Sequence, residues 1–214
     1  MRRRDLLGAA CATGITCLLP AAPYAAERAQ RRFRIFRDGS DIGTHTLSAT
    51  LDDRGFIIEI RIDIAVKILG FTAYSYNLIN RETWRDQKLF EVNSRVNDDG
   101  TEDFCRVQRD GDELVVSGSR FSGRVDGNAV TTSYYHPDFI DRRPWISTQS
   151  GKPLEIEIAE DGTRIFQVSG ELTTRLHYDA RGEWVDVDFD AGGEPGTYEL
   201  ISETGLISPL WTAS

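Results

Sequence analysis

Cysteine is scarce in this chain, and the scarcity excludes a disulfide-built domain. Only three cysteines occur in 214 residues, and two of them, Cys11 and Cys17, lie in an N-terminal segment that we expect to be removed. Cys105 then stands alone, so no intramolecular disulfide can form in the mature chain. Its setting, Phe104-Cys105-Arg106, is typical of a strand, and we expect a small buried side chain there rather than a reactive thiol.

Long hydrophobic runs are also lacking, which argues against a stable membrane span. The uncharged stretch from Leu6 to Leu19 would form about 21 Å of helix, short of the roughly 30 Å hydrocarbon core. It follows three arginines and precedes small residues, which is the layout of a secretory signal. Its weak hydrophobicity behind Arg3-Arg4-Asp5-Leu6-Leu7 resembles a twin-arginine signal, with an ordinary secretory signal as the alternative. We expect a signal peptide over 1–26, cleaved within 22–29, and a periplasmic protein.

Catalytic and cofactor-binding signatures are absent as well. The chain has no Gly-x-Ser-x-Gly elbow, no His-Glu-x-x-His motif, no phosphate loop and no dinucleotide fingerprint. The repeat Asp186-x-Asp188-x-Asp190 lacks the glycine and the glutamate that a calcium loop needs. The spacing of the histidines gives no support to a zinc site built from His45, His136 and His177. We predict no cofactor and no metal, and the catalytic residues, if any, are unknown.

Basic residues are fewer than acidic ones. The chain has 25 Lys and Arg against 34 Asp and Glu, a net charge of −9. Removing the signal takes away three arginines and one aspartate and leaves −11. Such an acidic surface disfavours nucleic acid as a partner.

In residues 27–214, apolar and polar residues alternate with a period of two. From Phe56 to Lys67, isoleucines and a valine occupy every second position, which predicts a long half-buried antiparallel strand. Tyr74–Trp84 is a second long strand, and Asp-Gly pairs mark hairpin turns at strand-sized spacing. No stretch of 27–214 shows a helical period with caps. We therefore predict a single all-β domain with an antiparallel curved sheet, barrel-like or rolled, and a β-sandwich as the alternative.

One irregular segment interrupts the strands and is the best candidate for a site. It runs as a long loop from about 134 to 152, with one helical turn expected after Pro137. Aromatic, imidazole, acid and amide groups crowd it, and the candidate ligand-binding residues are Tyr134, His136, Asp138, Trp145 and Gln149. The alternative is a plug that closes one end of the barrel, with Tyr134 and Trp145 as buried anchors.

A second aromatic set lies on one predicted strand. Tyr74, Tyr76 and Trp84 share a strand face by parity. They could line a ligand cavity with their polar tips inward. Ordinary core packing is the alternative interpretation.

Several short motifs resemble a family of exported, mainly proteobacterial proteins that is known only as a domain of unknown function. The similarity runs from about Phe33 to Leu200. It rests on Glu82-x-Trp84, on Ser133-Tyr134-Tyr135-His136-Pro137, on Thr148-Gln149-Ser150-Gly151-Lys152 and on His177-Tyr178-Asp179. The resemblance implies a β-rich, barrel-like fold and a place in the cell envelope, and it implies no reaction.

Three functional hypotheses follow from these patterns. The first is a non-enzymatic barrel-like module that binds a small apolar ligand or an envelope component. The second is an enzyme acting on a glycan or lipid, with Tyr134, His136, Asp138 and Gln149 as acid, base and orienting groups. The third is a structural or assembly partner that presents a sheet edge.

Overall fold

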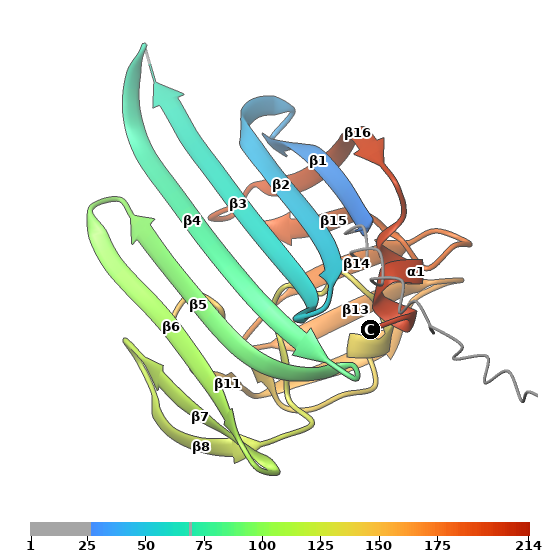
Figure 1. The fold of residues 1–214 in the computed structure, drawn as a ribbon. Helices are drawn as coiled ribbons and strands as arrows, with labels where there is room; N and C mark the ends of the chain where they lie inside the picture. Colours follow the sequence, from blue (N-terminus) through green and yellow to red (C-terminus); the bar gives the residue numbers. More distant parts are fainter. Residues whose placement is uncertain (1–26, 69) are drawn as a thin grey trace, which may run out of the picture.

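A computed structural model describes residues 27–68 and 70–214, and the expected signal segment 1–26 lies outside them. Thirteen strands form one antiparallel sheet in the order β12-β13-β14-β15-β16-β1-β2-β3-β4-β5-β6-β7-β8 (Figure 1). Apart from the pair β16 and β1, strands that are adjacent in this sheet follow one another in the order of the sequence. Their bounds are β1 Glu27–Arg37, β2 Ser40–Asp52, β3 Gly55–Ile68, β4 Phe71–Arg85, β5 Lys88–Asp98, β6 Thr101–Asp110, β7 Glu113–Gly118, β8 Ser122–Asp126, β12 Ile156–Glu160, β13 Ile165–Gly170, β14 Thr174–Tyr178, β15 Trp184–Asp190 and β16 Pro195–Thr204.

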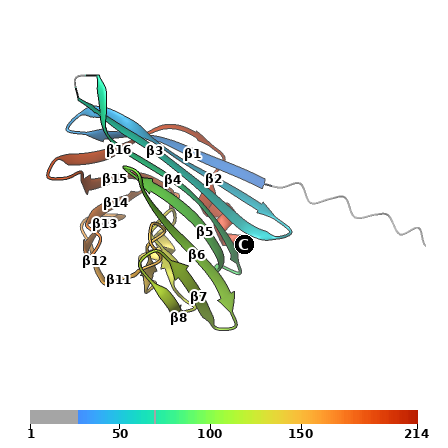
Figure 2. The same cartoon turned by 90° about the vertical axis from the view of Figure 1, so that its left-hand side faces the viewer.

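The sheet rolls up because long paired strands twist and its two halves are joined by one long-range pairing. β16 pairs with β1, which places the C-terminal strands beside the N-terminal ones. The edge strands β8 and β12 are not hydrogen-bonded to each other in the sheet. This confirms the predicted curved, barrel-like sheet, and one continuous sheet in place of two decides against the β-sandwich (Figure 2).

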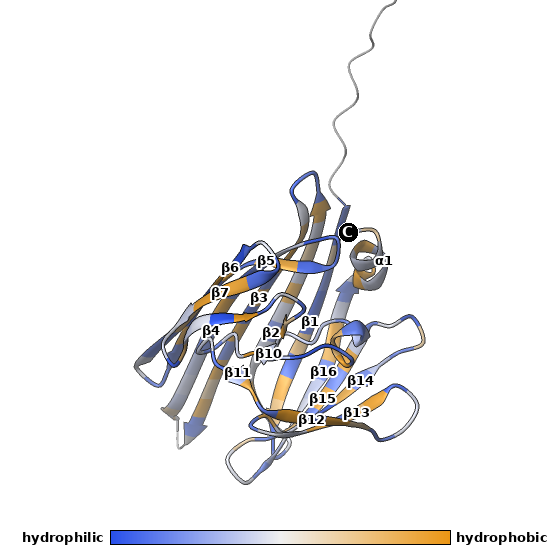
Figure 3. Cartoon of the chain, turned by 90° about the horizontal axis from the view of Figure 1, so that it is seen from below, coloured by the Kyte–Doolittle hydropathy of each residue, from blue (hydrophilic) through white to orange (hydrophobic). Residues whose placement is uncertain are grey.

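The connection between the two edges carries the irregular segment of the sequence. It contains a 3-10 turn η1, Pro137–Phe139, which confirms the helical turn expected after Pro137. A small three-stranded sheet orders it further, with β9 Val130–Thr131, β10 Trp145–Ile146 and β11 Pro153–Leu154. Seen from below, β10 and β11 lie between the two arms of the rolled sheet (Figure 3).

The turns follow the predicted chemistry. Asp38 and Gly39 both have positive φ, 45° and 69°, as a two-residue hairpin turn requires. Asp99 and Gly100 repeat this geometry with φ of 49° and 91°. The predicted long strands are confirmed as β3 and β4, which form the longest hairpin of the sheet.

A short C-terminal helix, α1 Ile207–Thr212, corrects the expectation that no helix forms. Six residues are too few to show a helical period in sequence, and Leu206 provides no side-chain cap. Tertiary packing holds the helix instead, because Ile207, Leu210 and Trp211 are all buried. Within the described residues, no helix combines the length and the apolar character needed to cross a membrane.

Candidate functional site

One end of the rolled sheet is filled by aromatic side chains. Trp84 of β4 lies 5.1 Å from Trp211 of α1 and 5.2 Å from Phe139 of η1, measured between ring centroids. Tyr135 packs against Phe139 at 4.8 Å and against Phe56 of β3 at 5.8 Å. All five side chains are at most 1% exposed. These five residues define the filled end, where aromatic rings pack the interior of the rolled sheet.

The loop around His136 belongs to the filled end. His136 is 5% exposed, and its Nδ1 accepts a hydrogen bond from the backbone N–H of Asp138 at 3.2 Å. The Asp138 carboxylate accepts the indole N–H of Trp211 at 2.8 Å, and its Oδ1 lies 3.4 Å from His136 Nδ1. The His136 side chain first, and then the bond from Trp211, lower the pKa of Asp138. Trp145, fully buried, donates its indole N–H to the carbonyl of Phe139 at 2.9 Å. These contacts fix the loop as a plug.

The other end of the sheet is hollow. A cavity of about 510 Å³ opens there between β3, β4, β15 and the turns beside them. Its volume is within the usual range for small-molecule sites, and its wall is mainly apolar. We call it the mouth cavity, and its lining residues are Arg37, Ile42, Ile64, Val66, Tyr74, Phe189, Asp190, Ala191 and Gly192.

A chain of aromatic rings leads from the mouth cavity toward the plug. Phe189 lies 5.7 Å from Tyr198, which lies 5.6 Å from Trp184. Trp184 lies 5.4 Å from Tyr134, whose ring stacks on Trp145 at 6.3 Å. A continuous line of aromatic rings therefore runs through the interior beneath the mouth cavity.

Tyrosine hydroxyls add a few polar groups to this apolar interior. Burial raises the pKa of Tyr134 to about 12, and burial raises the pKa of Tyr76 still further. Tyr74 donates its hydroxyl to Asp98 at 2.8 Å, and desolvation followed by this bond raises its pKa to about 12. These phenols remain neutral at physiological pH, so they can only donate or accept hydrogen bonds.

A separate polar cluster surrounds Glu82 on the inner face of β4. Glu82 is fully buried, and its carboxyl accepts bonds from Asn80 Nδ2 at 2.8 Å and Trp84 Nε1 at 3.0 Å. Ser133 of the plug donates to it at 3.3 Å. Desolvation raises the pKa of Glu82, against the opposing effect of these bonds. No cation pairs with it among the described residues, so the cluster ties the plug to β4 through hydrogen bonds alone.

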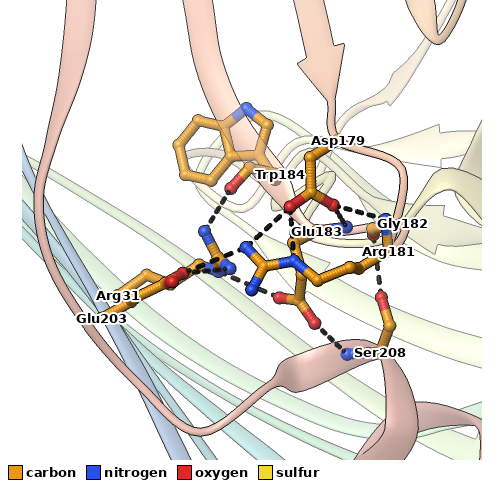
Figure 4. Close-up of polar contacts among 8 residues, drawn as sticks. All are labelled: Arg31, Asp179, Arg181, Gly182, Glu183, Trp184, Glu203 and Ser208. Carbon is orange, nitrogen blue, oxygen red and sulfur yellow. Dashed lines mark hydrogen bonds and ion pairs between the residues drawn. The ribbon is translucent and has the colours of Figure 1, made fainter.

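A buried ion pair fastens α1 to the sheet (Figure 4). Arg31 of β1 is 1% exposed and donates from Nε to Glu183 at 2.9 Å and from Nη2 to Glu203 at 2.7 Å. The second carboxylate oxygen of Glu183 accepts the backbone N–H of Ser208 at 2.8 Å, at the start of α1. The network therefore has a structural role at the filled end.

The predicted site residues are distributed over three places. Tyr74 lines the mouth cavity, while Tyr76 and Tyr134 face the aromatic interior beneath it. Trp84, His136, Asp138 and Trp145 belong to the filled end and its plug. Gln149 lies in a turn beside the end of β7, and no hydrogen bond or ion pair in the described chain joins it to His136 or Asp138.

The aromatic set of β4 shares one face, as parity predicts, but not one cavity. Trp84 lies ten residues beyond Tyr74, which is roughly 33 Å along an extended strand. Tyr74 is therefore at the mouth, and Trp84 is at the filled end. Sequence reasoning missed Ile42 and residues 189–192 at the end of β15, because their place at the mouth depends on pairings that are distant in sequence.

The three histidines also occupy separate environments. His45 lies among Phe33, Trp184 and Tyr198 in the core, and His136 packs on Trp211. His177 bonds to Asp188 at 3.0 Å on β14. Across residues 27–68 and 70–214, no group of three or more His, Cys, Asp or Glu side chains could hold a metal. Burial raises the pKa of Cys105 to about 12, so it remains a buried thiol as expected.

Comparison with known proteins places the chain in a family. The model of a domain of unknown function, DUF6134, matches residues 33–201. The chain belongs to this family. The curated proteins contain no match to it. A solved structure described as a "Beta-barrel-like Protein of Domain of Unknown Function DUF1849 from Brucella abortus" is similar in fold. It has 10% identity and a TM-score of 0.53, and the match covers 86% of this chain and 98% of that one.

The matched range of this DUF6134 domain holds the mouth cavity and the plug. It does not include Arg31 or α1, although Trp211 completes the filled end and Arg31 anchors the helix. At 10% identity the DUF1849 structure bears on the fold alone. The function of the DUF6134 domain must therefore be argued from its own cavity.

Proposed function

We propose that this protein binds a small, largely apolar ligand in the mouth cavity, without chemical conversion. The observation that carries the proposal is the contrast between the two ends of one rolled sheet. Aromatic side chains pack the interior at one end, whereas at the other end about 510 Å³ remains open behind a mainly apolar wall. Ile64, Val66 and Phe189 give the open end an apolar wall, and burying an apolar chain there is favourable by about 0.8 kcal/mol per CH₂.

The geometry favours binding over the enzyme hypothesis. An acid–base site through the 134–152 segment needs His136, Asp138 and Gln149 at one accessible point. His136 is 5% exposed and Asp138 is engaged by Trp211, so both serve the plug. An assembly role would use the free edges of β8 or β12, and periplasmic cross-linking tests it.

A cavity-filling variant tests the binding proposal. Ala191→Trp places an indole in the mouth cavity from a turn, and Ala180→Trp places the same indole in an exposed turn at the opposite end. The probe is N-phenyl-1-naphthylamine, followed by fluorescence, together with n-alkanols of increasing length as competitors. We expect about fourfold tighter competition per CH₂ until the cavity is full. Ala191→Trp should weaken binding at least tenfold, and Ala180→Trp should not change it.

The same protein purified from cells offers a second test. Organic extraction followed by mass spectrometry should recover an apolar molecule from the wild type and less of it from Ala191→Trp. Equal probe binding by both tryptophan variants, with no retained molecule, would refute ligand binding in the mouth cavity.

We further propose that the protein acts in the periplasm after twin-arginine export. The support is the sequence Arg3-Arg4-Asp5-Leu6-Leu7 before a weakly hydrophobic stretch. Replacing Arg3 and Arg4 together by lysine keeps the positive charge but removes the twin-arginine pattern. Export should then stop, as measured by protease accessibility in spheroplasts. Unchanged export of the lysine variant would indicate an ordinary secretory signal.

A further inference from the structure

A second cavity adjoins the mouth cavity and differs from it in chemistry. Its volume is about 590 Å³, and it shares Arg37, Ile42 and Val66 with the mouth cavity. The rest of its wall is mostly polar, and charged groups of both signs line it. We call it the polar cavity, and its charged residues are Arg37, Lys67, Asp38, Asp41 and Glu194.

The two cavities meet where β2 and β3 separate. Pairing between these strands ends at Gly43 opposite Ile64, and β3 continues beyond that point as part of a hairpin that projects past its neighbours (Figure 1). The strands are close at the last pair, because a Cβ on Gly43 would lie 2.1 Å from the carbonyl oxygen of Asp63. Beyond this pair, Ile42 and Val66 line both cavities. The two cavities are therefore adjacent, and a molecule lying across Ile42 and Val66 would reach both.

Most charges of the polar cavity form no ion pair with each other. Asp41 pairs with Arg34 at 3.4 Å. Arg37, Lys67, Asp38 and Glu194 line the same cavity, yet none has an ion-pair partner within 4.0 Å in the described part of the chain. Without the Arg34–Asp41 pair, the cavity presents two cations and two carboxylates.

This balance indicates the chemistry of the group that the cavity would hold. Guanidinium and ammonium groups bind phosphate oxygens, and carboxylates bind an ammonium. A purely anionic group would be repelled by Asp38 and Glu194. A purely cationic group would be repelled by Arg37 and Lys67. A group that carries both charges can satisfy both pairs.

We propose that the polar cavity binds the zwitterionic headgroup, a phosphate next to an ammonium, of a single-chain amphiphile whose chain occupies the mouth cavity. This proposal rests on the proposed function of the mouth cavity. Arg37 and Lys67 bind the phosphate, and Asp38 and Glu194 bind the ammonium. Arg37 lies at the junction because it lines both cavities.

Calorimetry with ligands of one chain length tests the proposal. The ligands are lysophosphatidylethanolamine, lysophosphatidylglycerol and the n-alkanol, and glycerophosphoethanolamine supplies the headgroup alone. We expect lysophosphatidylethanolamine to bind at least tenfold more tightly than the other two chain ligands. The headgroup alone should bind at least a hundredfold more weakly than lysophosphatidylethanolamine.

Variants in which one charged residue is replaced by a neutral one then test which residue binds which part of the headgroup. Lys67→Gln, which changes the polar cavity and not the lining of the mouth cavity, should lower the affinity for both phospholipids at least fivefold and leave the affinity for the alkanol unchanged. Glu194→Gln should remove the preference for ethanolamine over glycerol. Arg32→Gln, at an exposed position that lines neither cavity, is the control and should have no effect.

Two results would refute different claims. Equal binding of all three chain ligands, unchanged in Lys67→Gln, would overturn the headgroup proposal and leave chain binding intact. Failure of every chain ligand to bind, the alkanol included, would overturn the proposed function itself.

Discussion

Replacing His45 by phenylalanine should make the protein more resistant to acid. His45 is 3% exposed, and neither of its ring nitrogens has a hydrogen-bond partner among the described residues. Its ring lies 5.2 Å from Trp184 and 5.5 Å from Tyr198. Burial lowers its pKa from 6.5 to about 3. The imidazole is therefore neutral in the folded protein at pH values where the unfolded chain protonates it.

The direction and size of the effect follow from proton linkage. Below pH 6.5 the unfolded chain takes up a proton at His45 that the folded protein does not, so the free energy of unfolding falls as pH falls toward 3. At pH 4.5 the loss is about 2.7 kcal/mol, from about 1.36 kcal/mol for each of the two units below 6.5. Phenylalanine binds no proton, so His45→Phe lacks this loss.

Urea unfolding followed by far-ultraviolet circular dichroism measures the effect. The free energy of unfolding of His45→Phe, relative to wild type, should increase by about 2.7 kcal/mol from pH 7.5 to pH 4.5. The other titrating groups are the same in both proteins, so their contributions cancel in this difference. His177→Gln, which removes the partly exposed imidazole beside Asp188, is the control for a lost histidine. A difference that stays constant with pH would show that His45 is not held neutral in the folded state.

Three further changes test the filled end. Wild-type stability should fall as pH rises above 4.5, because the unfolded chain releases the Glu82 proton that the folded protein, with its raised pKa, still holds. Glu82→Gln lacks this loss, so its free energy of unfolding should rise relative to wild type by up to about 1.36 kcal/mol per pH unit, as urea unfolding at pH 5, 6 and 7 measures. Trp211→Ala should cost about 3–5 kcal/mol in chemical unfolding, since its indole fills the space beside Trp84. Arg31→Met should cost about 3–5 kcal/mol by leaving Glu183 buried without its cation, and adding Glu183→Gln should recover part of this; thermal unfolding of both variants decides it.

The candidate site could be predicted only in part. Tyr74 lies at a cavity as the aromatic pattern indicated, and Trp145 is buried as an anchor of the plug. The pattern could not show that Trp84 lies at the opposite end from Tyr74, because parity gives the face of a strand and not its surroundings. In the sequence, Phe189 shows only the alternation of an ordinary strand. It lines a cavity because β15 pairs with β16, and β16 pairs with β1.

The sequence by itself determined the local structure of this protein. Alternation of apolar and polar residues specifies strands with one buried face, and Asp-Gly pairs specify hairpin turns such as those at Asp38-Gly39 and Asp99-Gly100. Both signals depend on residues within a few positions of each other. The tertiary structure alone decided which end is filled and which is hollow. Arg31 and Glu183 form an ion pair although they are 152 residues apart in the sequence. Trp211 contacts Trp84 because it lies on a helix that is too short to show a helical period in the sequence. Such contacts depend on register and long-range pairing, which no local pattern contains.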